Sequence, residues 1–344
     1  ILVNILMHLF NAIILSGYVP DAFGVGVIVP LIKNSDVDSG NIDNYRGITL
    51  SPCISILFEL CLLIHLKPYL KTSDLQFGFK EDLGCIHALY TVRAALDYFN
   101  RFGSTVTLCA LDISKAFDKV DHYVLFSKLV DRKIPVCFLN VLISWYSKCN
   151  AIVRWGGSFS RSFVVNAGVR QGSVLSPYLF AVYIDQLIRA LESSGHGCVV
   201  HGVYLGCIVY ADDNFLMSHS SCSMQSMLHI CSNEIAKLRL TFNSKKSVTL
   251  RIGPRFNSDC ASLYLDGNVL QSVTKVRYLG IFITSSRRMV CPFEHIRLKF
   301  YSTFNAIYRR SKSADSELVT VELIRSFCLP LITHWRLLIF VLLL

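Results

Sequence analysis

Three aspartates in this chain of 344 residues lie where they could support metal-dependent chemistry. Asp212 and Asp213 are adjacent and separate two apolar runs, which predict buried strands joined by a hairpin turn. Asp112 ends a third apolar run of the same kind, residues 105–111. Carboxylates are costly to bury without compensation, and a hard divalent cation with oxygen ligands would neutralise them.

Solvated turn residues are the competing explanation, because an Asp-Asp pair is also common in ordinary hairpins. If the strand that ends at Asp112 neighbours the strands around Asp212 and Asp213, all three carboxylates meet at one edge of a sheet. Such an edge suits two divalent cations about 3.5–4 Å apart, one activating an attacking hydroxyl and the other holding a leaving pyrophosphate. Together the three positions therefore favour nucleotidyl transfer.

The composition indicates a polyanionic partner and a reducing environment. Hydrophobic residues make up 52% of the chain, which is ample for a core and argues against disorder. The net charge of +10 indicates nucleic acid as the partner, with a solvated basic surface as the alternative. The 13 cysteines contain no CxxC pair, so they fit free thiols better than a disulfide framework.

Hydrophobic periodicity predicts the elements that must position these residues. Residues 1–15 form an amphipathic helix that ends at Gly17. Residues 25–32 are rich in β-branched side chains but include Pro30, so we expect an edge strand or a hairpin arm, to which residues 45–50 return. Further helices are predicted over residues 54–70, 86–99, 138–146, 176–192 and 224–240, near 122, and from 293 onward. Further strands are predicted over residues 205–209, 215–217 and 248–252, with a hairpin of 151–155 and 162–166.

The two ends of the sequence carry separate expectations. The chain begins at Ile1, so we expect an internal fragment of a longer polypeptide. Residues 337–344 are wholly apolar but fall far short of the ~20 residues that span a bilayer. We expect them to be the start of a truncated core element or read-through outside the fold, and we expect no membrane segment.

The residues around the aspartates resemble the motifs of reverse transcriptases from non-LTR (LINE-type) retrotransposons. Motifs A, B, C, D and E are matched in that order by residues 111–122, 168–177, 210–213, 243–247 and 278–280. Upstream, residues 29–33 and 44–50 resemble the fingers motifs, although Gly47 and Thr49 depart from the usual Tyr-Arg-Pro-Ile-Ser, and Gly47 loosens the loop that carries Arg46. The similarity extends to about Leu331, and six or seven motifs in order are far more specific than Tyr-x-Asp-Asp alone.

The resemblance implies an α+β fold of the right-hand polymerase class. Such a fold has fingers, a palm made of an antiparallel sheet backed by helices, and a helical thumb. The fingers are expected over residues 1–104, with 122–160 returning to them, and the palm over 105–121 and 161–285. Residues 286–344 are expected to form the thumb, complete or truncated.

The resemblance also implies a metal centre with two Mg²⁺ ions, which Mn²⁺ can replace. Asp112 and Asp212 are expected to hold both ions, and Asp213 to assist the ion near the primer 3′ end. The carbonyl of Ile113 is expected to complete one coordination shell. Lys246 is the candidate proton donor to the pyrophosphate, with its neighbour Lys245 as the rival.

Substrate contacts are implied in the same way. The residues expected to bind the incoming dNTP are Lys33, Arg46, Phe117, Gln171 and Gly172, and those expected to grip the primer are Tyr278, Leu279 and Gly280. Arginine suits phosphate, a bulky ring under the sugar leaves no room for a 2′-hydroxyl, and glycine lets backbone approach a ligand closely. The alternatives are solvated loop charges for Lys33 and Arg46, core packing for Phe117, and a turn requirement for Gly172.

The function implied is an RNA-directed DNA polymerase of a non-LTR retrotransposon, which copies element RNA into DNA. Its expected partners are an RNA template, a DNA primer at nicked target DNA, dNTPs, and an endonuclease domain on the same full-length polypeptide. Nucleus and cytoplasm are the expected compartments. An intron-encoded reverse transcriptase, an RNA-directed RNA polymerase and an inactive nucleic-acid-binding remnant remain as alternatives.

Overall fold

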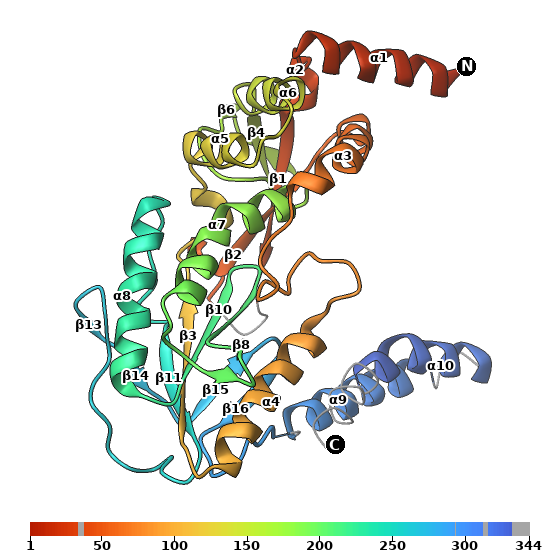
Figure 1. The fold of residues 1–344 in the computed structure, drawn as a ribbon. Helices are drawn as coiled ribbons and strands as arrows, with labels where there is room; N and C mark the ends of the chain where they lie inside the picture. Colours follow the sequence, from red (N-terminus) through yellow and green to blue (C-terminus); the bar gives the residue numbers. More distant parts are fainter. Residues whose placement is uncertain (34–37, 293, 312–315, 332–344) are drawn as a thin grey trace. The chain divides into compact units, whose positions relative to one another are not determined.

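The computed structural model describes residues 1–33, 38–292, 294–311 and 316–331, and the apolar run 337–344 lies outside them. The chain divides into two compact units, each with helices and sheet, which confirms the predicted α+β class (Figure 1). The first unit comprises Ile1–Phe79, Ile113–Ala190 and Ile230–Phe242, and the second comprises Lys80–Asp112, Leu191–His229 and Asn243–Leu344. None of the helices in the described ranges combines the length and apolar character that crossing a bilayer requires.

The first unit is built on a five-stranded sheet. Its strands are β1 (Val25–Ile32), β2 (Tyr45–Leu50), β4 (Asn150–Trp155), β5 (Ser158–Phe159) and β6 (Phe163–Val164). β1 pairs antiparallel with β2, as a hairpin arm should, but it also pairs in parallel with β4, so the edge-strand prediction is wrong. Pro30 is tolerated because the pairing with β4 covers only Val25–Ile28 of β1.

The helices of this unit pack on one another and supply an aromatic core. They are α1 (Leu2–Ser16), α2 (Asp21–Gly24), α3 (Cys53–Leu66), α5 (His122–Asp131) and α6 (Val136–Tyr146), with short 3₁₀ turns at Ile42–Asn44, Lys67–Tyr69 and Phe117–Lys119. α7 (Ser176–Ser193) and α8 (Ser221–Lys237) are divided between the two units. Phe58 is fully buried, with its ring 4.9 Å from that of Phe10 and 5.5 Å from that of Trp145. α1 ends at Gly17, whose φ of 68° closes the helix as predicted.

The second unit is built on a sheet with the strand order β14-β11-β3-β10-β9. The bounds of these strands are Gln271–Ser272, Val248–Ile252, Val106–Asp112, Asp213–Ser218 and Cys207–Tyr210. Two-stranded pairs flank it: β7 (Val199–Val200) with β8 (Val203–Tyr204), β12 (Tyr264–Leu265) with β13 (Asn268–Val269), and β15 (Lys275–Tyr278) with β16 (Ile281–Thr284). Its helices are α4 (Cys85–Arg101), α9 (Glu294–Ser311) and α10 (Glu317–Leu323), which continues as a π-helical turn, Ile324–Cys328. The central strands are apolar and almost fully buried, as the sequence predicts.

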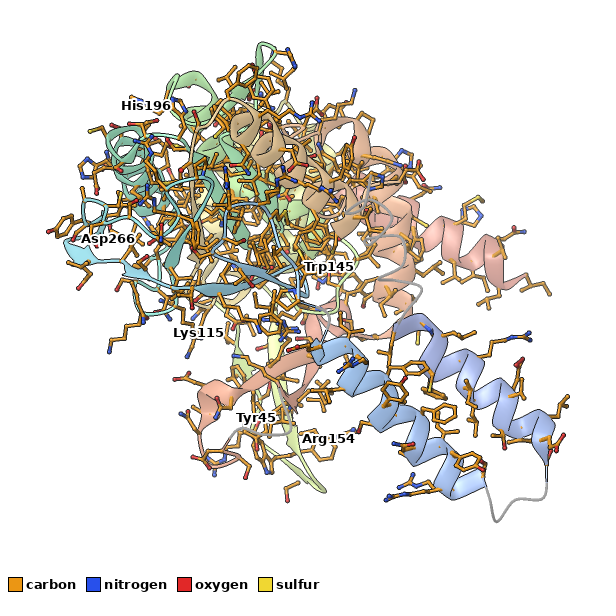
Figure 2. The ribbon with its side chains drawn as sticks, turned by 90° about the horizontal axis from the view of Figure 1, so that it is seen from below. Tyr45, Lys115, Trp145, Arg154, His196 and Asp266 are labelled. Carbon is orange, nitrogen blue, oxygen red and sulfur yellow. The ribbon has the colours of Figure 1, made fainter. Side chains whose placement is uncertain are left out.

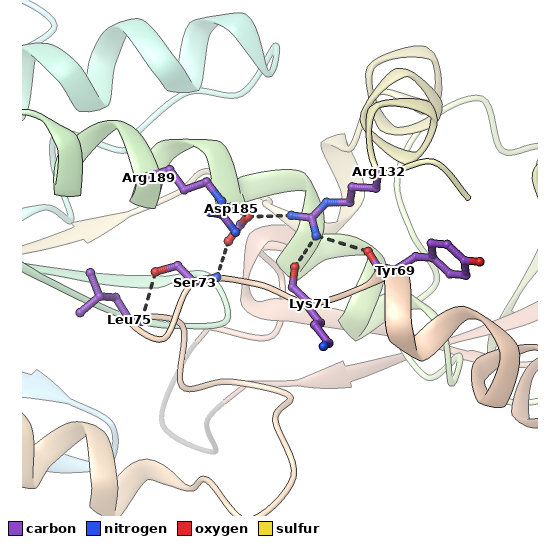
Figure 3. Close-up of polar contacts among 7 residues, drawn as sticks. All are labelled: Tyr69, Lys71, Ser73, Leu75, Arg132, Asp185 and Arg189. Carbon is purple, nitrogen blue, oxygen red and sulfur yellow. Dashed lines mark hydrogen bonds and ion pairs between the residues drawn. The ribbon is translucent and has the colours of Figure 1, made fainter. Parts of the chain in front are cut away.

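A buried aspartate ties the loop after α3 to α7 in the first unit (Figure 3). Asp185 is 1% exposed and accepts hydrogen bonds from Arg132 Nη2 (2.6 Å), Arg189 Nε (2.7 Å) and the backbone N–H of Ser73 (2.7 Å). Arg132 also donates to the carbonyl of Lys71. Because charged partners and a backbone amide surround this carboxylate, its burial is compensated, and the loop has one fixed position on α7.

Replacing Asp185 with alanine should destabilise the first unit by about 3–5 kcal/mol, because Arg132 would keep its charge in a poorly solvated place. Urea denaturation followed by the fluorescence of Trp145, which is buried in the same unit, measures the loss. Asp21→Ala is the control, since its ion pair with Lys148 involves a side chain that is 79% exposed. Equal shifts of the unfolding midpoint for the two variants would contradict the account of Asp185.

Candidate active site

Two of the predicted catalytic residues are paired across β3 and β10, which are neighbouring strands of the second unit (Figure 1). β3 ends at Asp112, β10 begins at Asp213, and the two strands pair antiparallel with these residues directly opposite. Asp212 precedes Asp213 in the turn that joins β9 to β10. The condition that the sequence left open is therefore met, because the strand that ends at Asp112 is the neighbour of the hairpin that carries the other two.

The backbone hydrogen bonds of Asp112 show which kind of pair this is. Its N–H donates to Ser247 Oγ at 3.1 Å, and its carbonyl accepts from the N–H of Asn243 at 2.8 Å. The N–H and C=O of a strand residue point to the same side, which here is away from β10. Asp112 and Asp213 thus form a non-hydrogen-bonded pair, the type in which Cα atoms are only about 4.5 Å apart and side chains come closest. Like charges directly opposite one another are unfavourable unless a cation lies between them.

The hairpin turn holds Asp212 next to this pair. Tyr210 and Asp213 are the paired residues on either side of the turn. Ala211 has a φ of 58°, a left-handed conformation that costs a residue with a Cβ about 1–2 kcal/mol. Asn214, which is 3% exposed, donates from Nδ2 to the carbonyl of Asp212 at 2.9 Å. A strained turn fixed by a buried amide therefore places Asp212 at the same end of the sheet.

The donor set at this end suits a hard divalent cation, since carboxylate oxygens are the ligands that such ions prefer. Within the described ranges, no three His, Cys, Asp or Glu side chains are already gathered so that they could hold a metal ion. The side chains of Asp212 and Asp213 are exposed, whereas Asp112 is half-buried. Ligation would therefore require rotation of exposed side chains, with no change in the backbone pairing.

Two more residues are predicted for metal binding and proton transfer. Ile113 directly follows Asp112, and Lys246 lies in the loop that begins at Asn243. Ile113 is buried in the first unit, where it forms an isolated bridge with Phe242. Lys246 is exposed, like Lys245, and its backbone N–H donates to the carbonyl of Asn243 at 3.1 Å. Since Asn243 is itself bonded to Asp112, the loop that carries Lys246 is tied to the strand end. The roles of Ile113 and Lys246 stay predictions.

The predicted primer grip is the turn of the β15–β16 hairpin. Tyr278 is 4% exposed, stacks on Phe215 with 4.2 Å between ring centroids, and donates from its hydroxyl to the carbonyl of Ile208. Burial raises the pKa of Tyr278 well above its usual value, so its phenol is neutral at physiological pH. Only Leu279 and Gly280, at the turn itself, are exposed enough to meet a ligand. Tyr278 is a core residue that holds this turn to the sheet.

A second tyrosine lies beside the aspartates. Burial and a hydrogen bond with Cys85 raise the pKa of Tyr210 to about 12. Its phenol is therefore also protonated at physiological pH and cannot accept a proton there as a general base. Tyr210 is therefore not a candidate for proton transfer beside the aspartates.

Phe117, the predicted sugar-contacting residue, lies in the first unit between two other rings. It stacks on Phe180 with 4.5 Å between centroids, and Phe79 approaches edge-on at 6.4 Å. Phe79 ends the segment that Asp185 anchors. Phe180 and Phe79 thus pack on the Phe117 ring, while the side chain remains half-exposed, and its contact with a sugar stays a prediction.

The predicted nucleotide pocket residues Gln171 and Gly172 lie in a loop bonded to β2. The carbonyl of Gln171 accepts from the N–H of Thr49 at 2.7 Å, and its Nε2 donates to Asp118 Oδ1 at 3.0 Å. Gly172 has a φ of 122°, and a Cβ there would lie 2.7 Å from the carbonyl oxygen of Thr49. Glycine is thus required for the contact with β2, and the role of Gly172 in a nucleotide pocket stays a prediction.

Lys33 and Arg46 lie at the ends of β1 and β2. The ammonium group of Lys33 donates to the carbonyl of Asp43 at 2.7 Å, so it helps to hold the connecting loop. Arg46 is exposed on β2. Its neighbour Tyr45 contacts Trp155, and Figure 2 labels Tyr45 and Arg154 at this end of the sheet. Arg46 thus lies near an exposed strand end, and its contact with phosphate stays a prediction.

Sequence reasoning missed the function of Glu59, although its place in an apolar helix was a signal. Glu59 is 5% exposed and accepts hydrogen bonds from Ser173 Oγ (2.8 Å to each oxygen) and from the backbone N–H groups of Val174 (2.5 Å) and Leu175 (3.3 Å). Burial raises the pKa of Glu59, while these bonds and Arg170 act in the opposite direction. The carboxylate thus fixes the loop that follows Gly172 at the start of α7.

Replacing Gly172 with alanine should disrupt the contact between this loop and β2, because the new Cβ meets a backbone oxygen and the φ is unfavourable. We expect a loss of about 1–3 kcal/mol in the free energy of unfolding, measured by urea denaturation. Gly157→Ala is the matched control, because its Cβ would meet nothing within 4 Å. A Gly172→Ala protein as stable as the control would show that the loop has room to move.

Comparisons with known proteins identify the family to which the chain is similar. A family model described as "Reverse transcriptase (RNA-dependent DNA polymerase)" matches residues 32–283. The chain is 25% identical over 302 residues to the Pol polyprotein of the type-2 retrotransposable element R2DM from Drosophila melanogaster, covering 85% of this chain and 28% of that protein. It is 26% identical over 307 residues to the RNA-directed DNA polymerase from mobile element jockey of Drosophila funebris, covering 84% of this chain and 32% of that protein. The chain therefore spans about a third of the length of these relatives.

Solved structures with the same fold include two yeast telomerases. The apo telomerase from Candida tropicalis, truncated from its C-terminal domain, has a TM-score of 0.54 at 12% identity and covers 80% of this chain and 56% of that one. The telomerase from Candida albicans in complex with a TWJ fragment of telomeric RNA has a TM-score of 0.53 at 11% identity and covers 83% and 49%. These similarities concern the fold alone, and they confirm the predicted right-hand polymerase fold.

Proposed function

The chain belongs to the reverse transcriptase family, and from this premise we propose that it is the RNA-directed DNA polymerase of a non-LTR retrotransposon, copying element RNA into DNA. Enzymes of this family depend on divalent metal ions. The observation that carries the proposal is the cross-strand pair of Asp112 and Asp213 beside the Asp212 turn. Two-metal nucleotidyl transfer needs several carboxylates at one place on a rigid support, and the end of this sheet supplies them.

The metal ions in this proposal are two Mg²⁺, replaceable by Mn²⁺. Asp112 and Asp212 would hold both ions, Asp213 would support the one near the primer end, and the carbonyl of Ile113 would complete a shell. When bound, the ions lower the pKa of the primer 3′-hydroxyl and neutralise charge on the triphosphate during in-line displacement. The carboxylates would keep the ions in place because β3 and β10 fix the backbone positions of Asp112 and Asp213.

Other side chains orient the substrates and move the proton. Lys246, with Lys245 as the rival, gives a proton to the leaving pyrophosphate from an exposed loop that is tied to Asp112 through Asn243. Lys33 and Arg46 bind the triphosphate as cations.

The sugar, the base and the primer end are bound by other parts of the chain. Gln171 and Gly172 line the nucleotide pocket, and the half-exposed face of Phe117 excludes a 2′-hydroxyl. The turn of Tyr278, Leu279 and Gly280 grips the primer end, with the buried tyrosine as its anchor.

The partners in this proposal are an RNA template, a DNA primer at nicked target DNA, and dNTPs. The net charge of +10 supports binding of these polyanions. An endonuclease domain on the full-length polypeptide would cut the target, and the protein would work in the nucleus and cytoplasm. The family suggests three subdomains. They are the fingers over 1–104 and 122–160, the palm over 105–121 and 161–285, and the thumb over 286–344.

Primer extension on an RNA template tests the proposal. The wild-type chain should extend a DNA primer with dNTPs only when Mg²⁺ or Mn²⁺ is present. Asp212→Ala should reduce extension by at least about a thousandfold, because this carboxylate holds both ions, and Asp213→Ala should retain more activity. Equal extension by the wild type and Asp212→Ala would refute the assignment of the metal site. Salt-sensitive RNA binding without metal-dependent extension would favour a binding remnant.

Replacing Phe117 with alanine should relax the discrimination between deoxynucleotides and ribonucleotides. Removing the ring makes room for a 2′-hydroxyl, and a steric difference of this size is worth about ten- to a hundredfold in relative kcat/KM. Single-nucleotide incorporation of dNTP against rNTP measures the ratio, with Phe102→Ala, which alters a ring that is 70% exposed in the second unit, as the control. A wild-type preference for rNTPs would instead indicate an RNA-directed RNA polymerase.

A further inference from the structure

The strand that carries Asp112 is longer than its neighbour β11. β11 begins at Val248, whose partner in β3 is Ala110, so Asp112 lies two residues beyond that last pair. The backbone N–H and C=O of Asp112 point to the side of β11, because the alternation of the ladder directs those of Ala110 and Asp112 the same way. Something other than a strand must therefore satisfy them, since unpaired backbone groups at such a place are costly.

Ser247 and Asn243 supply the missing partners. The hydroxyl oxygen of Ser247 accepts from the N–H of Asp112 at 3.1 Å, as the carbonyl of a longer β11 would do. The N–H of Asn243 donates to the carbonyl of Asp112 at 2.8 Å. Ser247 is 0% exposed, so water does not compete for its hydroxyl. The backbone of Asp112 is thus held on both its donor and its acceptor.

The turn that carries Ser247 is itself closed. The N–H groups of Lys246 and Ser247 both donate to the carbonyl of Asn243, at 3.1 and 2.9 Å. The backbone of Ser247 is therefore held close to Asn243, and the same closed turn supplies both contacts with Asp112. An aspartate side chain has only two rotatable bonds, so the position of its backbone decides where its carboxylate can reach.

We propose that Ser247 is a positioning residue for the metal site: its buried hydroxyl holds the backbone of Asp112 so that the carboxylate lies opposite Asp213. This inference rests on the proposed function, in which Asp112 is a metal ligand. The loop 243–247 would then position Asp112 as well as carry Lys246. Residues that orient a ligand from behind typically change metal affinity by about 10–100-fold when they are lost.

Binding of Mn²⁺ to the full chain, followed by the electron paramagnetic resonance signal of the free ion, tests the proposal without an activity assay. Ser247→Ala should weaken Mn²⁺ binding by about tenfold or more. Ser218→Ala is the matched control, because Ser218 is also 0% exposed and lies in β10 of the same sheet, opposite Thr107 and away from the aspartates. This control should bind Mn²⁺ like the wild type.

A second variant separates positioning from folding. Ser247→Cys keeps nearly the size of serine but is a weak hydrogen-bond acceptor, so it should melt near the wild type and still bind Mn²⁺ more weakly. Unchanged Mn²⁺ affinity in both Ser247 variants would overturn the inference. If Asp212→Ala abolishes Mn²⁺ binding while both Ser247 variants bind normally, this inference fails and the proposed metal site is kept. A wild-type chain that binds no Mn²⁺ would overturn both.

Discussion

The register between β3 and β10 is the constraint on which the second unit depends. It places Asp112 opposite Asp213. Side chains alternate between the faces of a sheet, so a slip of one residue would turn every side chain of one strand to the other face and separate the two carboxylates. The residues behind them resist such a slip, because both strands are nearly fully buried and a slip would misplace each of their apolar side chains.

The charges and the apolar core of this sheet act against each other. Two carboxylates directly opposite one another repel, which alone would separate the strand ends. The buried strand residues compensate, and they are Leu108, Cys109, Leu111, Phe215, Leu216 and Met217. Polar residues then hold the backbone at the charged end: Ser247 and Asn243 at Asp112, and Asn214 at Asp212. A cation at this end would remove the remaining repulsion, so binding and stability are coupled there.

Local patterns in the sequence predicted the parts of the site that depend on local structure. Apolar runs between turn residues predicted β3, β9 and β10 and placed the aspartates at their ends, and the order of the motifs pointed to the family. Contacts between distant segments have no local signal. The parallel pairing of β1 with β4 joins residues more than a hundred positions apart, so the sequence predicts the hairpin with β2 but not the second neighbour of β1. The partners of Glu59 and Ser247 could not be predicted for the same reason, although a glutamate in an apolar helix did mark Glu59 as unusual.

The central claim is that a divalent cation binds at the end of β3 and β10. Anomalous diffraction from crystals soaked in Mn²⁺ measures this most directly, because it locates the ion without relying on activity. We expect a Mn²⁺ peak in contact with carboxylate oxygens of Asp112 and of the Asp212-Asp213 turn. Mn²⁺ peaks elsewhere on the protein, with none at these aspartates, would contradict it.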